Sequence, residues 1–137
     1  MQKSLMLICC TLMLVMTIGC SEKDEVHYTY LDGSGNKYIL SPDGTLEYDP
    51  VSTEESSSGE YSGGKPVIKK IKPTILDNIK STINIAIENK DVQISKRVKM
   101  SGFIEVRGGK KKNVYILSPS SEEKSKIEIT LKAALTK

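Results

Sequence analysis

The sequence has no tryptophan, one histidine and only three cysteines in 137 residues. All three cysteines lie within the first twenty residues, so the rest of the chain has no thiol for a disulfide bond or a cysteine-rich zinc site. A histidine-based catalytic or metal-binding cluster would have to be built on His27 alone. Glycine-rich phosphate-binding patterns are also absent. We therefore expect no cofactor, no metal site and no enzymatic activity.

Aromatic side chains are scarce as well, with six tyrosines and one phenylalanine. Hydrophobic residues make up 38% of the chain and charged residues 27%. This composition lies above the disordered class but provides little material for a core. Together with the length, it predicts a single small domain.

The first nineteen residues have the three-part layout of a secretory signal peptide. Lys3 is followed by an apolar stretch from Leu5 to Met16 and then by the boundary Gly19-Cys20. A transmembrane anchor is the alternative interpretation. It is disfavoured because about fifteen strongly apolar residues fall short of the roughly 20 that span a hydrocarbon core.

The Gly19-Cys20 boundary resembles the lipobox of bacterial lipoproteins. The resemblance implies that Cys20 becomes the lipid-modified N-terminus, carries two or more acyl chains and anchors the protein in a bacterial cell envelope. Ser21 resembles the residue that follows the cysteine in lipoproteins sorted to an outer membrane. The resemblance covers only this segment and implies nothing about the fold of the remaining chain.

After a short tether over residues 20–25, we expect one domain over residues 26–137. Its first part alternates strand-forming residues with turn residues, which predicts a meander of strands over 26–31, 38–40 and 45–48. A Ser/Gly/Glu-rich stretch near 49–65 then has the composition of a flexible loop. The alternative is a binding loop with Tyr61 as an aromatic anchor.

Two segments have helical spacing of apolar residues, 74–89 and 121–135. Thr74 with Asp77, and Ser120 with Glu123, resemble capping boxes at their starts. Strands remain the alternative for both, because isoleucines also alternate in each segment.

Apolar residues of one parity predict a long strand over 92–106, bent near Ser101-Gly102. A turn over residues 108–112 leads into a further strand over 114–117, which completes a hairpin. The expected fold class is α+β, with a small antiparallel sheet of about five strands and two helices.

One pentapeptide occurs twice, Tyr-Ile-Leu-Ser-Pro at 38–42 and again at 115–119. Both copies are predicted to be the second strand of a hairpin and the turn after it. Because their flanks do not align and their spacing is far from solenoid periods, we interpret the repeat as reuse of a good strand ending.

Charge is distributed unevenly, since residues 21–61 have a net charge of −8 and residues 62–137 a net charge of +10. The basic half suggests a surface that faces phospholipid headgroups or an anionic envelope polymer. The strongest candidates are Arg107, Lys110, Lys111 and Lys112, and the wider set adds Lys69, Lys70, Lys96, Arg97 and Lys99. A solvated basic face without a partner is the alternative.

These patterns predict a membrane-anchored envelope lipoprotein that acts as a non-catalytic binding or accessory module. Its expected partners are the membrane, through the lipid, and an envelope protein or anionic polymer, but not nucleic acid, because the protein is exported. The first alternative is a structural envelope component that assembles with other subunits. The second is a hydrolase that uses a carboxylate pair such as Asp43 with Glu47.

Overall fold

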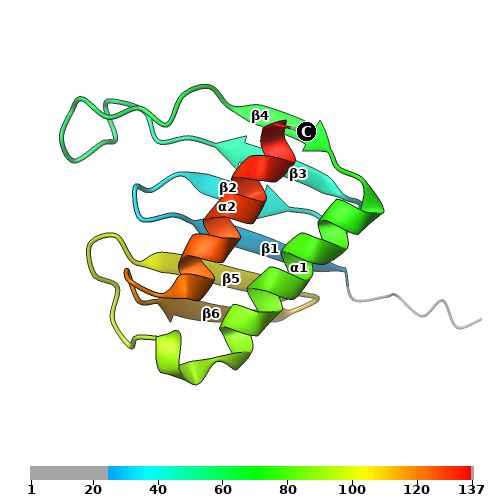
Figure 1. Ribbon diagram of the computed structural model, residues 1–137. Coiled ribbons are helices and arrows are strands. Elements are labelled where there is room, and N and C mark those ends of the chain that lie inside the picture. The colour runs from blue at the N-terminus through cyan, green and yellow to red at the C-terminus, as the bar shows by residue number, and fades with distance from the viewer. Residues whose placement is uncertain (1–24, 137) are drawn as a thin grey trace, which may run out of the picture.

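The computed structural model describes residues 25–136, which form an antiparallel six-stranded sheet with two helices on one face (Figure 1). The strands lie in the order β4-β3-β2-β1-β5-β6. Their bounds are β1 Val26–Leu31, β2 Lys37–Leu40, β3 Thr45–Asp49, β4 Val67–Lys70, β5 Gly102–Gly108 and β6 Lys111–Leu117. The helices are α1 Pro73–Glu88 and α2 Glu122–Thr136, with a 3₁₀ turn η1 at Lys90–Val92. The predicted α+β class is confirmed, with one strand more than expected.

The N-terminal meander forms as predicted, because each connection contains residues suited to a tight turn. Asp32 Oδ1 accepts the N–H groups of Ser34 and Asn36 at 2.9 and 3.0 Å, which closes the β1–β2 turn. In the β2–β3 turn, Gly44 has a φ of +84° and donates its N–H to Ser41 O.

The core lies between the sheet and the two helices. Alternate residues of the central strands point to this side, where Tyr30, Leu40, Leu46, Ile104 and Leu117 are each at most 2% exposed. The helices cover them with buried side chains at helical spacing, namely Ile79, Ile83 and Ala86 from α1 and Ile127, Leu131 and Ala134 from α2. All of these residues follow Glu25, so a chain that begins at Ser21 contains the whole described fold.

The strand that the sequence did not predict is β4, at the edge of the sheet. It pairs with β3, with Leu46 opposite Lys69 and Glu47 opposite Ile68. Two of its four residues are lysines, so apolar and polar residues do not alternate along it as they do in a typical half-buried strand. Charged residues on an edge strand also disfavour pairing with another chain.

Both helices are present, but their starts differ from the predicted capping boxes. Lys72 is the N-cap of α1 and makes no side-chain cap, because its ammonium group cannot accept a hydrogen bond. Pro73 occupies the first helical position, where its missing N–H costs nothing. In α2, Ser121 rather than Ser120 caps the helix, and its Oγ accepts the N–H of Lys124 at 3.3 Å.

The strand predicted over residues 92–106 is wrong in its first two thirds. Gln93 turns back to α1 and donates its Nε2–H₂ to Ala86 O at 3.1 Å and Ile87 O at 2.8 Å. These bonds satisfy carbonyls that the helix end leaves free. A loop follows from residue 94 to 101, with Met100 at a φ of +65°, and β5 begins only at Gly102.

The two copies of the repeated pentapeptide have the same local structure. Each supplies the end of a hairpin's second strand, β2 in one case and β6 in the other. Each then turns with a hydrogen bond to the carbonyl of its serine, from Gly44 N–H to Ser41 O and from Ser121 N–H to Ser118 O. The repeat therefore encodes a strand followed by a β-turn.

Candidate functional site

The β5–β6 hairpin brings together the four basic residues singled out from the sequence. Gly108 pairs with Lys111, so only Gly109 and Lys110 form the turn. Gly109 has a φ of +54°, which suits a two-residue hairpin turn. Arg107 pairs with Lys112 directly below the turn. The predicted hairpin is confirmed, and it presents Arg107, Lys110, Lys111 and Lys112 at one tip, which we call the basic tip.

A single carboxylate partly neutralises the basic tip. Glu105 accepts Arg107 Nη2 at 2.7 Å and Lys112 Nζ at 2.8 Å. Lys112, and after it Arg107, holds the pKa of the Glu105 carboxyl below its usual range. Within residues 25–136, Lys110 and Lys111 have no ion pair. The tip thus has four cations against one anion.

The basic tip lies where the preceding chain joins the domain. Val26, the first residue of β1, pairs with Gly108 at the end of β5. Cys20, the predicted lipid site, lies outside the described residues and only six positions before Val26. Six extended residues reach at most about 20 Å. A group attached to Cys20 therefore stays within that distance of the first β1 residue.

The wider set of basic candidates does not form one surface. Lys69 Nζ donates to Leu135 O at the end of α2, and Lys70 pairs with Asp43 at 2.7 Å. Lys96, Arg97 and Lys99 belong to the 94–101 loop, at the opposite end of the sheet from the basic tip (Figure 1). The predicted cations therefore fall into two main groups at opposite ends of the sheet, the basic tip and the 94–101 loop, and only the basic tip lies beside Val26.

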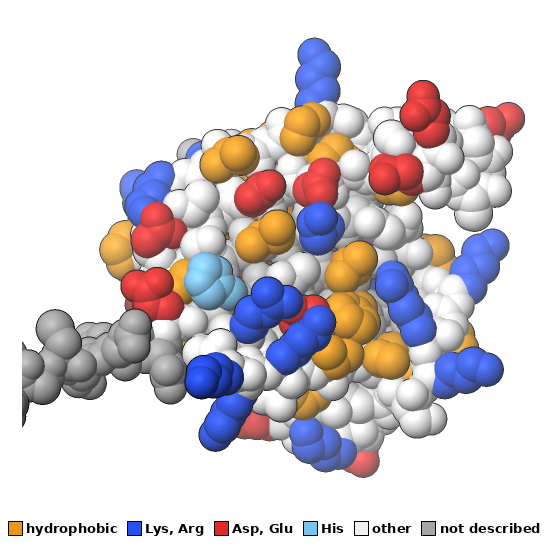
Figure 2. Space-filling view, turned by 180° about the vertical axis from the view of Figure 1, so that it is seen from behind, with side chains coloured by type: hydrophobic (Ala, Val, Ile, Leu, Met, Phe, Trp, Pro, Cys, Tyr) orange, Lys and Arg blue, Asp and Glu red, His pale blue; other side chains and the backbone are white. Residues whose placement is uncertain are grey.

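The sheet face opposite the helices is uncovered within the described residues, and sequence reasoning did not single it out. Six large apolar side chains point to it from five strands, namely Leu31, Ile39, Ile68, Phe103, Val114 and Ile116. Ile68 is 73% and Val114 43% exposed. Figure 2 shows this face, with hydrophobic side chains among basic ones that gather beside the pale blue histidine. We call it the open face.

His27 and Asp43, one of the two predicted carboxylates, lie in different surroundings. His27 lines a shallow hollow of about 310 Å³ on the open face with Thr29, Ile39, Glu105 and Arg107. Asp43 pairs with Lys70, whose ammonium is the main reason that its pKa falls to about 2. A carboxyl with so low a pKa is ionised at neutral pH and is a poor general acid.

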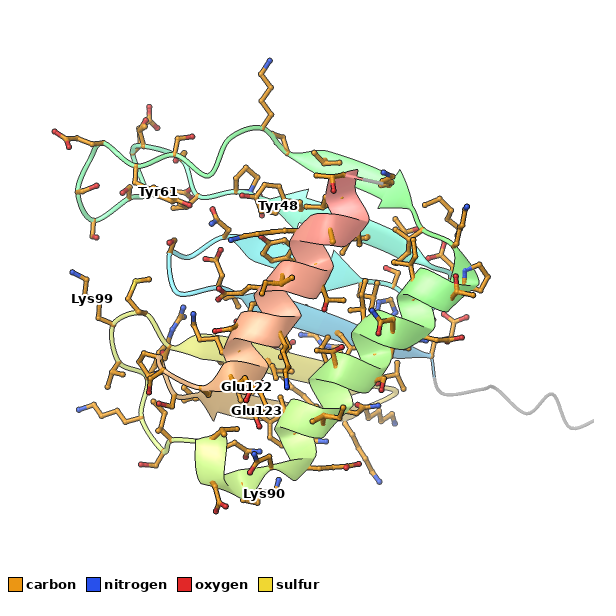
Figure 3. All side chains as sticks on the ribbon, viewed as in Figure 1. Tyr48, Tyr61, Lys90, Lys99, Glu122 and Glu123 are labelled. Atoms are coloured by element: carbon orange, nitrogen blue, oxygen red, sulfur yellow. The ribbon has the colours of Figure 1, made fainter. Side chains whose placement is uncertain are left out.

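At the end of the sheet away from the basic tip, two loops flank a second hollow, of about 380 Å³ (Figure 3). Tyr61 in the long loop, residues 50–66, lies on one side and Lys99 on the other. Tyr61 Oη accepts Asn36 Nδ2 at 3.0 Å, and Tyr48 donates its hydroxyl to Gly63 O at 2.7 Å. These two hydrogen bonds tie the long loop to β3 and to the β1–β2 turn.

The fold and these surfaces define an α+β protein with a half-covered antiparallel sheet. The sequence matches no protein-family model and no curated protein at a significant level. Over residues 25–136, no helix has the length and apolar character needed to cross a membrane. The same part of the chain contains no group of three or more His, Cys, Asp or Glu side chains placed to hold a metal ion.

Proposed function

We propose that this protein is a lipid-anchored, non-catalytic module of a bacterial cell envelope, held close to an anionic membrane surface by its basic tip. The observation that carries the proposal is the pairing of Val26 with Gly108. It places the four cations beside the point where a tether from Cys20 would enter the domain. A lipid on that tether and the basic tip would then contact the same membrane.

The expected strength of the electrostatic contribution follows from the charges at the tip. Each Lys or Arg near an anionic membrane surface contributes about 1 kcal/mol. Glu105 offsets one of the four cations. About 3 kcal/mol then remains, which strengthens membrane partitioning by roughly two orders of magnitude. This contribution supplements the acyl chains and falls as salt is raised.

Vesicle binding of the unlipidated domain, residues 21–137, tests the proposed role of the tip. We expect co-sedimentation with vesicles that contain phosphatidylglycerol and none with neutral phosphatidylcholine vesicles. Replacing Lys110, Lys111 and Lys112 together by glutamine should abolish most of the binding to anionic vesicles.

A matched control removes the same charge elsewhere. Lys65, Lys96 and Lys99 are all exposed, and none lies in the β5–β6 hairpin. Their combined replacement by glutamine should weaken vesicle binding much less than the tip variant does. Equal losses in the two triple variants would reduce the effect to net charge and contradict a role for the basic tip.

Anchoring is tested separately in cells. Labelling with a radioactive fatty acid should depend on Cys20, and Cys20→Ala should leave an unprocessed precursor. Label that persists in the Cys20→Ala protein would overturn the lipoprotein assignment, whatever the vesicles show.

A further inference from the structure

We propose that the hollow between the long loop and the 94–101 loop binds an acidic glycan, a chain of sugar rings in which some rings carry a carboxylate. Its lining combines an exposed tyrosine ring, serine hydroxyls, one carboxylate and two cations. Tyr61 and Lys99 lie on the two loops that flank it (Figure 3). Small-ligand sites typically combine apolar or aromatic surface with a few polar groups that fix the orientation of the ligand.

The two cations of the hollow are available for an anion. Arg97 and Lys99 are exposed, and neither forms an ion pair within residues 25–136. The guanidinium of Arg97 lies over the ring of Phe103, 5.7 Å from its centre. A guanidinium stacked in this way keeps its N–H groups at its edge, where they can bind a carboxylate through two parallel hydrogen bonds. This side of the hollow therefore suits the acidic group of a ligand.

The opposite side of the hollow suits sugar hydroxyls. Residues 56–58 are three consecutive serines, whose hydroxyls both donate and accept hydrogen bonds. Glu55 Oε2 accepts the N–H and the hydroxyl of Ser52 at 3.2 and 3.0 Å, and a carboxylate has further lone pairs for sugar hydroxyls. Glu55 also leaves the lining with one positive charge in excess, which matches a single carboxylate. It would repel a chain with a charge on every unit, such as a polyphosphate.

A buried polar network holds Tyr61 in position. Asp32 and Asn36 are only 5% and 3% exposed. Asn36 Nδ2 donates to Asp32 Oδ2 at 2.8 Å and to Tyr61 Oη at 3.0 Å. Tyr61 itself remains 41% exposed. An aromatic ring that is already in place can stack on the apolar C–H face of a sugar without first losing rotamer freedom, which favours binding.

The basic side of the hollow is anchored on the same β1–β2 turn. Gly33 packs so closely on the 94–101 loop that a Cβ at this position would lie 2.8 Å from Met100 O. Met100 lines the hollow and has a φ of +65°, in the left-handed region that is costly for residues other than glycine. Strained backbone of this kind is concentrated at ligand-binding and active sites. Both sides of the hollow are therefore positioned before a ligand arrives.

The position of the hollow in the domain agrees with a glycan ligand, an argument that rests on the proposed function. β1 begins at Val26, beside the basic tip, and ends at Leu31, two residues before Gly33. Its five residue steps of about 3.4 Å separate these ends by about 17 Å. With the basic tip on a membrane, the hollow opens at least that far from the lipid surface, where a polysaccharide of the envelope can reach it.

An NMR titration of residues 21–137 with two matched saccharides tests the site. The acidic probe is a hyaluronan tetrasaccharide, in which glucuronate alternates with N-acetylglucosamine, and the neutral probe is the tetramer of N-acetylglucosamine. We expect a dissociation constant on the order of 0.1 to 1 mM for the acidic probe and one at least about fivefold higher for the neutral probe. Chemical shifts should change in the two loops and the β1–β2 turn, and not in the β5–β6 hairpin.

Substitutions separate the acidic group from the sugar ring. Arg97→Gln combined with Lys99→Gln should weaken binding of the acidic probe about fivefold and leave the neutral probe unchanged. The triple glutamine variant of Lys110, Lys111 and Lys112 removes more charge and is the matched control, which should leave both probes unchanged. Tyr61→Ala should weaken both probes, whereas Tyr61→Phe keeps the ring and should retain most of the affinity. Thermal unfolding shows that each variant is folded.

Three results would overturn the glycan site: no chemical-shift change in the hollow with about 10 mM of the acidic probe, equal losses in the double and the triple glutamine variants, and binding of polyphosphate at the same residues as tightly as the acidic probe. Vesicle binding without glycan binding refutes the site and leaves the proposed function standing. Glycan binding at the hollow without vesicle binding or fatty-acid label refutes the proposed function and leaves the site assigned.

Discussion

Glu128 on α2 contacts both the sheet and a buried lysine, so one substitution at this position tests how these polar contacts stabilise the packing of α2 on the sheet. Its Oε1 accepts the hydroxyl of Tyr30 at 3.0 Å and contacts Lys124 Nζ at 2.9 Å. The side chain of Lys124 is 8% exposed and that of Glu128 is 19% exposed, so neither charge is well hydrated. Burial, and after it the Glu128 carboxylate, raises the pKa of Tyr30 above its ordinary value. The phenol therefore stays protonated and donates.

Glu128→Gln removes the anion and leaves the Lys124 ammonium at a buried position. Loss of one partner from a buried ion pair costs about 3–5 kcal/mol. Because Glu128 keeps some contact with water, we expect the lower end, about 3 kcal/mol. Replacing all three groups together, as Tyr30→Phe, Lys124→Met and Glu128→Leu, removes every polar partner and should change the free energy of unfolding by no more than about 1 kcal/mol.

Equilibrium urea unfolding of residues 21–137 at pH 7, followed by circular dichroism, measures both effects. Glu122→Gln is the matched control on the same helix. The pair of Glu122 with Lys126 is also spaced i,i+4, but both side chains are at least 60% exposed. Its loss should cost less than about 0.5 kcal/mol. Equal costs for Glu128→Gln and Glu122→Gln would refute the idea that Lys124 depends on a buried partner.

Three further predictions concern local structure. Gly33→Ala should lower the free energy of unfolding by about 2 kcal/mol, because its Cβ would lie 2.8 Å from Met100 O, whereas Gly108→Ala meets only ordinary contacts and should be nearly neutral. The pKa of Asp43, about 2 beside Lys70, should rise toward 3.8 in Lys70→Gln when the carboxyl is titrated by NMR. Because this pKa is lowered by folding, its stabilisation is present above about pH 4 and is lost as the pH falls toward 2. Hydrogen exchange in the tip of the long loop should be faster than in the strands, since its few apolar groups do not offset the entropy of ordering. Strand-like protection there would contradict this.

The parts of the fold that were predicted correctly depend on local patterns. The meander could be predicted because each strand is followed at once by its own turn residues, as in Ser41–Gly44. The helices could be predicted because one face repeats every three or four residues in each. The same local patterns gave a wrong prediction where a side chain forms a hydrogen bond to another element. Gln93 has the neighbours of a strand residue, but its side-chain amide bonds to the last carbonyls of α1. The strand therefore begins only at Gly102.

The open face was missed for a different reason. Its apolar residues alternate with core residues along each strand, as Phe103 alternates with Ile104, so the sequence does not show which set the helices cover. Only the sheet order reveals that the second set is contiguous across strands distant in sequence. The sequence nonetheless contained a signal. Ile39 and Ile116 are apolar residues at the alternate positions of strands whose other positions are already apolar, which indicates that both faces of these strands are apolar.

The basic tip shows how far a charge pattern can be interpreted before pairing is known. The run Lys110–Lys112 marks a cationic turn in any fold, but its relation to the predicted lipid site depends on Val26 lying beside Gly108. If β5 paired with another strand, the same lysines could lie far from the tether and would have no reason to touch a membrane. The two triple glutamine variants test this dependence. Lys65, Lys96 and Lys99 have the same total charge as Lys110, Lys111 and Lys112, and the two sets differ in where they lie. Vesicle binding should therefore follow the distance of a cation from Val26, and not the net charge of the domain.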